Sequence, residues 1–240
     1  MNIRYLGHSG FLITTTNGIQ LLFDPFITPN PLAKDKVALS DIKPNFIFLS
    51  HAHFDHIADA EEISKASDAP IIGVWEIHSY FSEKGCKTYP MNVGGTWRPS
   101  PESPVSVKLV PAVHTSSFPN GQYGGVPVGF IISDGSYVLY YAGDTALSLE
   151  MELISERYTL DAAILPIGGT FTMDIEDAVE AALLLDVEHV IGMHYDTFDP
   201  IKIDHEKAKQ EFKDNDCTLH LLSIGETIDM AKLARASIRE

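Results

Sequence analysis

The run His51-Ala52-His53-Phe54-Asp55-His56 places three imidazoles and a carboxylate within six residues of the chain. It directly follows the apolar segment 46–50, FIFLS, which has the composition of a buried strand. Imidazole nitrogen and carboxylate oxygen are the donors that bind divalent zinc, manganese or iron in proteins. The run therefore predicts a metal site where a strand ends.

The composition of the chain is that of a globular protein with a sizeable core. It has 240 residues, of which 45% are hydrophobic and 21% are charged. This length suits one α/β domain. Residues 1–240 contain no linker, low-complexity tract or internal repeat that would mark a second domain. We expect a single domain over 1–240.

The charge is strongly acidic, because 17 basic residues face 33 acidic residues and the formal net charge is −16. Such a field repels phosphate polymers and anionic membrane surfaces. We therefore expect a small-molecule substrate as the partner, with no nucleic acid and no membrane. The pattern neither predicts nor excludes a homo-oligomer.

The two cysteines, Cys86 and Cys217, have no CxxC spacing, so they predict neither a disulfide framework nor a thiolate metal site. The first residues lack the charged leader and apolar region of a secretory signal. No segment approaches the ~20 apolar residues that a membrane span requires. These features are typical of a reduced, cytoplasmic protein.

Local patterns predict an antiparallel start followed by alternating strands and helices. Asn17-Gly18, a pair favoured in hairpin turns, lies between the apolar runs 11–15 and 21–23. Later strands are expected at 70–75, 105–110, 137–142, 160–165 and 189–193, and helices at 59–66, 75–81 and 174–185. Residues 90–127 are rich in Gly and Pro and favour loops around a sheet.

Three further candidate ligands, His114, Asp144 and His194, each come just after an apolar run. A strand end that opens into a loop is where α/β folds collect functional groups, because the backbone is fixed while the side chain projects into a crevice. Four separate segments are therefore expected to converge on one point.

This order of residues resembles that of the metallo-β-lactamase superfamily: HxHxDH at 51–56, then His114, then Asp144 within the sequence AGDT, then His194. The chain is further similar to metal-dependent hydrolases of the ascorbate-6-phosphate lactonase-like branch. The narrower resemblance rests on GHSGF at 7–11, FDPF at 23–26, PMNVGG at 90–95, HTSS at 114–117, LPIGG at 165–169 with FTM at 171–173, and MHYDTF at 193–198.

The resemblance implies an α/β (α+β) fold, a four-layer αββα sandwich of two mixed sheets with helices on both outer faces and the metal site at one edge. It also implies two adjacent metal ions. The first would be held by His51, His53 and His114, the second by Asp55, His56 and His194, and Asp144 would bridge the two ions.

Such a donor set leaves positions open for water, whose pKa falls to about 7 on a metal, and two ions about 3.5 to 4 Å apart can share a hydroxide. We therefore expect a binuclear metal-dependent hydrolase that attacks a small ester, lactone or phosphoester, with Asp55 and Asp144 as its catalytic carboxylates. Zn and Mn are the expected metals, and Fe and Ni also suit the donors. The alternative is an iron-binding oxidoreductase or a metal-dependent sensor on the same fold.

Five other residues are candidates for supporting the site. Asp24 either orients a ligating imidazole or is a turn residue before Pro25. His8 either lies near the metals or donates to a backbone carbonyl in the first hairpin. Thr145 and Tyr195 either contact substrate oxygens or form turns. Phe54 is expected to narrow the pocket or to favour apolar substrates. The remaining histidines, His78, His189, His205 and His220, are expected to be structural or on the surface.

Overall fold

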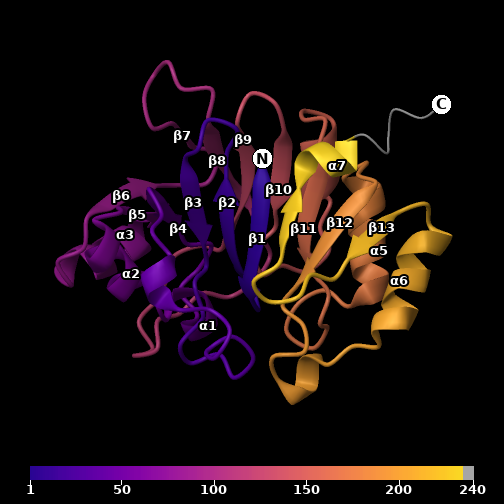
Figure 1. The fold of residues 1–240 in the computed structure, drawn as a ribbon, viewed down its shortest axis with the longest axis horizontal. Coiled ribbons are helices and arrows are strands. Elements are labelled where there is room, and N and C mark those ends of the chain that lie inside the picture. Colours follow the sequence, from indigo (N-terminus) through magenta and orange to yellow (C-terminus); the bar gives the residue numbers. More distant parts are fainter. Residues whose placement is uncertain (235–240) are drawn as a thin grey trace.

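Two mixed β-sheets of seven strands each form the centre of the molecule (Figure 1). The computed structural model describes residues 1–234. In spatial order the first sheet consists of β14 (Thr227–Asp229), β1 (Asn2–Gly7), β2 (Gly10–Thr14), β3 (Gln20–Phe23), β4 (Phe46–Phe48), β5 (Ile71–Val74) and β6 (Thr88–Met91). The second consists of β13 (Thr218–His220), β12 (His189–Met193), β11 (Ala162–Pro166), β10 (Val138–Tyr141), β9 (Val128–Ser133), β8 (Ser106–Pro111) and β7 (Thr96–Trp97).

Both sheets have the same pattern of strand directions. In the first, the pairings from β14 to β3 are antiparallel and those from β3 to β6 are parallel. In the second, the pairings from β7 to β10 are antiparallel and those from β10 to β13 are parallel. Each sheet is therefore mixed, as expected. Parallel strands require long crossover connections, and these carry the helices.

Aromatic side chains join the two sheets in the core. Phe23 on β3 and Phe48 on β4 stack with their ring centroids 5.2 Å apart. Both rings meet Phe130 on β9 edge-on, at 5.3 and 5.8 Å. The ring of Tyr141 on β10 lies 5.2 Å from that of Phe23. All four rings are buried, so their apolar area contributes to holding the sheets together.

Helices cover the outer face of each sheet. α3 (Trp75–Glu83) packs against β5 and β6, with α2 (Ala60–Ser67) beside it, whereas α5 (Ile175–Leu184) packs against β11 and α6 (His205–Asp214) against β13 (Figure 1). This confirms the αββα sandwich. The shorter helices are α1 (Phe54–Ile57), α4 (Glu150–Ser155), α7 (Met230–Ala234) and the 3-10 turns η1 (Leu39–Asp41) and η2 (Asp199–Ile201).

The predicted hairpin, strands and helices are present within one to three residues of the expected bounds. The β2–β3 pair surrounds Asn17-Gly18, and Asp174 caps α5 by accepting a hydrogen bond from the backbone N–H of Asp177. Trp75 begins α3 rather than ending the preceding strand. No expectation covered β9 and α6, although β9 is the strand that brings Phe130 into the core.

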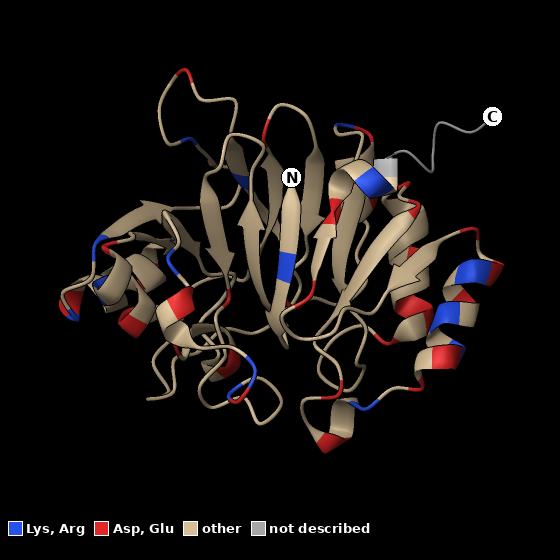
Figure 2. Ribbon diagram, in the orientation of Figure 1, with Lys and Arg blue, Asp and Glu red and all other residues tan. Residues whose placement is uncertain are grey.

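Charged residues lie mainly on the helices and loops outside the two sheets (Figure 2). The charged residues of α5 are all acidic, whereas α6 mixes both signs. Within residues 1–234, no helix combines the length and apolarity that crossing a membrane demands.

Candidate metal centre

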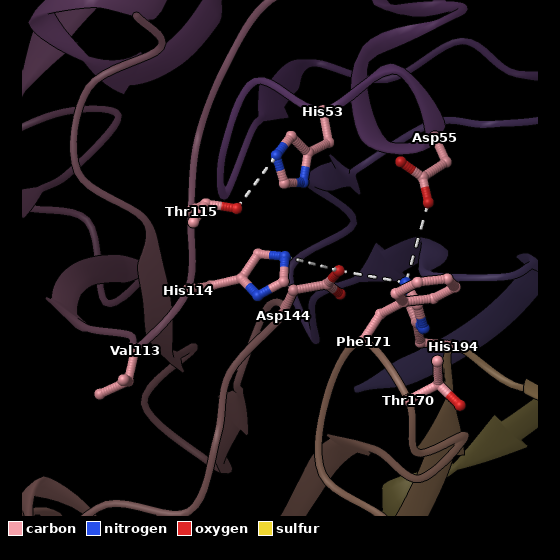
Figure 3. A pocket seen from close by; sticks show the side chains of 9 residues that line it. All are labelled: His53, Asp55, Val113, His114, Thr115, Asp144, Thr170, Phe171 and His194. Atoms are coloured by element: carbon pink, nitrogen blue, oxygen red, sulfur yellow. Dashed lines mark hydrogen bonds and ion pairs between the residues drawn. The ribbon is translucent and has the colours of Figure 1, made fainter.

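The candidate ligands lie just past the ends of four strands at one edge of the sandwich. His51 follows β4 by three residues, His114 follows β8 by three, Asp144 follows β10 by three, and His194 directly follows β12. β4 belongs to the first sheet and the other three strands to the second. The expected convergence of four segments is therefore present (Figure 3).

The histidines and Asp55 form two groups. One ligand atom from each of His51, His53 and His114 lies within 4.8 Å of the others. A second group within the same limit contains Asp55, His56 and His194, together with His8. These groups have the membership that the resemblance implies for two metal ions, with His8 as an additional member of the second.

Asp144 lies between the two groups. Its Oδ2 is 3.9 Å from Nε2 of His51 and 3.5 Å from Nε2 of His114 in the first group. The same oxygen is 3.3 Å from Nε2 of His56 and 3.1 Å from Nε2 of His194 in the second group. A carboxylate in contact with both groups is placed to bridge two cations.

Buried polar atoms without partners show that these residues fit a metal ion. Within residues 1–234, Nε2 of His56, Oδ1 of Asp144 and Nδ1 of His194 are buried and make no hydrogen bond. Leaving a buried polar atom unsatisfied costs about 1–3 kcal/mol, so such atoms are rare and call for an explanation. Metal coordination would satisfy Nε2 of His56 and Oδ1 of Asp144, because both residues belong to the candidate ligand set.

Protonation states suit metal binding in the first group. Burial lowers the pKa of His51 well below its ordinary value, and burial likewise lowers the pKa values of His53 and His114. Neutral imidazoles therefore offer lone pairs at neutral pH. In the second group, burial on its own would lower the pKa of His56, but Asp144 and Asp24 outweigh it and raise that pKa well above its ordinary value. Burial on its own would raise the pKa of Asp144, but His194 and His56 outweigh it and hold that pKa well below the ordinary range.

Asp24 orients an imidazole in each group. Its Oδ2 accepts hydrogen bonds from Nδ1 of His56 at 2.8 Å, from Oγ of Ser50 at 2.5 Å and from the hydroxyl of Tyr141 at 2.7 Å. Ser50 Oγ also lies 3.0 Å from Nδ1 of His51. Because a carboxylate accepts only, the network assigns the protons to Nδ1 of both rings and leaves both Nε2 atoms unprotonated. Nε2 of His56 has no hydrogen-bond partner among the described residues, whereas Nε2 of His51 lies 3.0 Å from Nδ1 of His53.

His8 holds Asp55 of the second group. Its Nε2 lies 3.0 Å from Oδ2 of Asp55, and its Nδ1 lies 3.0 Å from Oγ1 of Thr197. Burial, followed by the neighbouring His194, lowers the pKa of His8 to about 4, so the ring is neutral and Nε2 carries its proton. Neither ring nitrogen bonds a backbone carbonyl within residues 1–234, which favours the expected placement near the metals.

The pocket over these ligands has a volume of about 630 Å³. Beside the ligands, four residues that the motif reasoning did not single out contribute to its wall. The lining residues are His53, Asp55, Val113, His114, Thr115, Asp144, Thr170, Phe171 and His194 (Figure 3). The sequence signal that could have identified Phe171 as a pocket residue is its place in the FTM sequence at 171–173, which supports the resemblance.

None of the five supporting candidates is among the residues of this wall, and three of them contact other parts of the structure. Thr145 is buried, and its Oγ1 accepts from the backbone N–H of Val113 at 3.0 Å, so it supports the loop that carries His114. Tyr195 is buried and its ring lies 5.7 Å from that of His205. Phe54 lies in a neighbouring hollow with Ile57, so its expected effect on the metal pocket is not seen here.

The four remaining histidines lie apart from both ligand groups. His78 bonds Thr88 at 2.7 Å, and His205 bonds Asp196 at 2.6 Å. His189 on β12 lies 3.3 Å from the carbonyl oxygen of Leu233, and His220 lies 3.4 Å from His189. These partners are those of structural or surface side chains, as expected.

Solved structures share this architecture. Igni18, described as a novel metallo hydrolase from Ignicoccus hospitalis, has a TM-score of 0.84 and 37% identity, over 95% of this chain and 97% of that chain. An isothiocyanate hydrolase from Delia radicum gut bacteria has a TM-score of 0.74 at 14% identity, over 95% and 98% of the two chains. At that identity the second likeness shows the fold alone.

Sequence comparison identifies the family. Residues 2–194 match the Beta-lactamase superfamily domain. A UPF0173 metal-dependent hydrolase of Christiangramia forsetii is 47% identical over 230 residues, which cover 96% of this chain and 100% of the relative. Another from Thermus thermophilus is 41% identical, over 95% of this chain and 98% of the relative. The chain therefore belongs to the β-lactamase superfamily and, within it, to the UPF0173 metal-dependent hydrolases.

Proposed function

We propose that this protein is a binuclear metal-dependent hydrolase that cleaves a small ester, lactone or phosphoester. The observation that carries the proposal is the position of Asp144, whose Oδ2 lies within 3.9 Å of histidines from both ligand groups. A single-ion site would not require a carboxylate between two such groups. Zinc and manganese are the metals that we expect in the cytoplasm, where we place the protein.

When bound, the two ions would supply a hydroxide at neutral pH and polarise the oxygen of the scissile bond. The residues of this chain have distinct roles around them. Asp144 would supply negative charge to both ligand groups, and Asp24 keeps the ring of His56 facing Asp144. His8 fixes the carboxylate of Asp55 through Nε2. Water adds across the substrate bond, so an ester yields an acid and an alcohol.

The charge distribution supports a small-molecule substrate rather than a nucleic acid. The chain carries a formal net charge of −16, and the pocket of about 630 Å³ has the size of a small-molecule site. The similarity to the ascorbate-6-phosphate lactonase-like branch supports a lactone among the candidates.

Metal analysis combined with an Asp144→Asn variant tests the proposal. We expect nearly two metal equivalents in the purified wild type, and the loss of at least one in the variant. Hydrolysis of model esters should fall by about 10³-fold, since metal activation supplies several kcal/mol. Asp199→Asn is the matched control, because Asp199 is exposed and, within residues 1–234, forms an ion pair only with Lys202. Undiminished hydrolysis by a metal-free preparation would contradict the proposal.

The same preparation addresses the alternative of an iron-dependent oxidoreductase or sensor. Histidine and carboxylate donors suit iron as well as zinc. CmlA, a diiron β-hydroxylase from Streptomyces venezuelae, shares the fold with a TM-score of 0.69 at 12% identity, over 95% of this chain and 53% of that chain. Bound iron with visible absorption, together with no hydrolysis of any ester, lactone or phosphoester, would favour that alternative.

A further inference from the structure

The wall of the metal pocket contains no positive side chain. Among its described lining residues, the charged groups are the carboxylates of Asp55 and Asp144, and no Lys or Arg is present. Sites that recognise phosphate or carboxylate groups use Arg or Lys to pair with them. An anionic group of a substrate that lies away from the metals would therefore find no partner in this wall.

Three basic side chains, those of Lys84, Lys87 and Arg98, are engaged outside the pocket. Lys87 pairs with Asp68, and Arg98 donates to the backbone oxygen of Ser103 at 3.1 Å. Lys84 pairs with Glu61 at 3.2 Å in the hollow beside Phe54. None of these cations lines the metal pocket.

The non-ligand part of the wall is apolar on two sides. Phe171 and Val113 both line the pocket, and each leaves 52% of its surface exposed. Figure 3 shows the ring of Phe171 on the side of His194, with Val113 on the other side, beyond His114. Exposed aromatic and branched side chains beside a reactive centre offer binding area to an apolar group.

The loop that carries Phe171 is fixed in place. The backbone N–H of Phe171 donates to the oxygen of Gly169 at 2.6 Å. Thr170 Oγ1 donates to the backbone oxygen of Pro200 at 2.8 Å. Thr170 itself has φ 56°, a left-handed conformation that costs a non-glycine residue about 1 kcal/mol or more. The loop therefore maintains a strained turn that presents the ring of Phe171 to the pocket.

From these observations we infer that the substrate is an uncharged ester or lactone whose apolar group packs against Phe171, and that Phe171 determines this specificity. The inference rests on the proposed hydrolase function and narrows its substrate class. A second anionic group on the substrate loses hydration without gaining a cation. A longer alkyl group gains apolar contact, at about 0.8 kcal/mol for each fully buried CH₂.

A pair of esters that differ in one charge tests the inference on the metal-loaded protein. p-Nitrophenyl hexanoate and mono-p-nitrophenyl adipate share the leaving group and the acyl length, but adipate ends in a carboxylate. We expect kcat/KM for the hexanoate ester to exceed that for the adipate ester by about tenfold or more. We also expect kcat/KM for the hexanoate ester to exceed that for p-nitrophenyl acetate by about tenfold. An equal or higher value for adipate would overturn the inference.

Variants assign the effect to the ring of Phe171. Phe171→Ala should lower kcat/KM for hexanoate by about tenfold and change that for acetate less than about twofold. Leu183→Ala is the matched control, because Leu183 is 49% exposed on α5 and lies outside this pocket. An unchanged preference for hexanoate in Phe171→Ala would contradict the role of the ring.

Binding without turnover provides an independent measurement. Saturation-transfer NMR with hexanamide and adipamic acid, the matching amides, should detect hexanamide more strongly and show its signal reduced in Phe171→Ala. If a fully metal-loaded protein hydrolysed no ester, lactone or phosphoester, the hydrolase proposal would be refuted. Hydrolysis of esters with no preference for hexanoate would refute the substrate inference alone.

Discussion

His8 shows how one side chain can decide the geometry of a metal ligand. It links Asp55 to Thr197 through its two ring nitrogens, each at 3.0 Å, although 189 residues separate His8 from Thr197. Its backbone adopts φ 57°, a conformation that Asn tolerates better than most residues. His8 therefore acts as a positioning residue for the second ion of the proposed pair.

We predict that His8→Ala weakens the second metal site by about 10–100-fold and leaves the first unchanged, because partners of metal ligands have effects of that size. A competition titration with a chelator measures both affinities. His8→Asn should restore part of the affinity, since its amide keeps a donor. His78→Ala, at a histidine bonded to Thr88 in the remote helix α3, is the control. If both metal sites of His8→Ala bound metal with wild-type affinity, the positioning role of His8 would be excluded.

At the scale of elements, the loops after β11 and β12 pack against each other with no room for a side chain at Gly168. A Cβ on Gly168 would lie 2.2 Å from the backbone oxygen of His194 and 2.9 Å from Cβ of Ile201. Both contacts involve rigid parts of the neighbouring loop. The position of His194 therefore depends on a glycine from another loop.

We predict that Gly168→Ala destabilises the protein by about 1–3 kcal/mol, the usual cost of overpacking, and also removes the second metal ion because His194 is displaced. Chemical denaturation and metal analysis measure the two effects. Gly18→Ala is the matched control: Gly18 has φ 85° and open space around it, so its strain of about 1–2 kcal/mol should leave metal content unchanged. Full metal content in Gly168→Ala would show that the loops adjust independently.

At the scale of the whole molecule, the candidate metal centre takes its residues from strand ends of both sheets. His51, which follows β4, belongs to the first sheet, whereas His114, Asp144 and His194 follow strands of the second. Metal ions that have ligands from both sheets would bind the folded protein and not the unfolded chain. Metal binding must therefore stabilise the fold.

We predict that a chelator lowers the thermal midpoint and that added zinc or manganese restores it. The expected loss is about 2.7 kcal/mol for each site at a free metal concentration 100 times its Kd. Differential scanning calorimetry measures the change. In Asp144→Asn the chelator should have a smaller effect, because that variant starts with less metal. An identical midpoint with and without metal would show that the ions do not join the sheets.

Local patterns in the sequence predicted the β2–β3 hairpin, the main strands and the helices α2, α3 and α5, because these features depend on residue type and short spacing. The β2–β3 hairpin and helix α5, for example, carry their own turn and capping residues. The sandwich fold and the division of the candidate ligands into two groups were predicted from the resemblance to the metallo-β-lactamase superfamily.

Only the tertiary structure decided which residues support those ligands and what forms the pocket wall. Asp24 meets Tyr141 across 117 positions of sequence, and both alternatives for His8 suited the same local pattern. Phe54 adjoins the metal motif yet lies in another hollow, whereas Phe171, more than a hundred positions later, lines the pocket. Such contacts arise when two sheets pack, and packing brings together side chains that no local spacing relates.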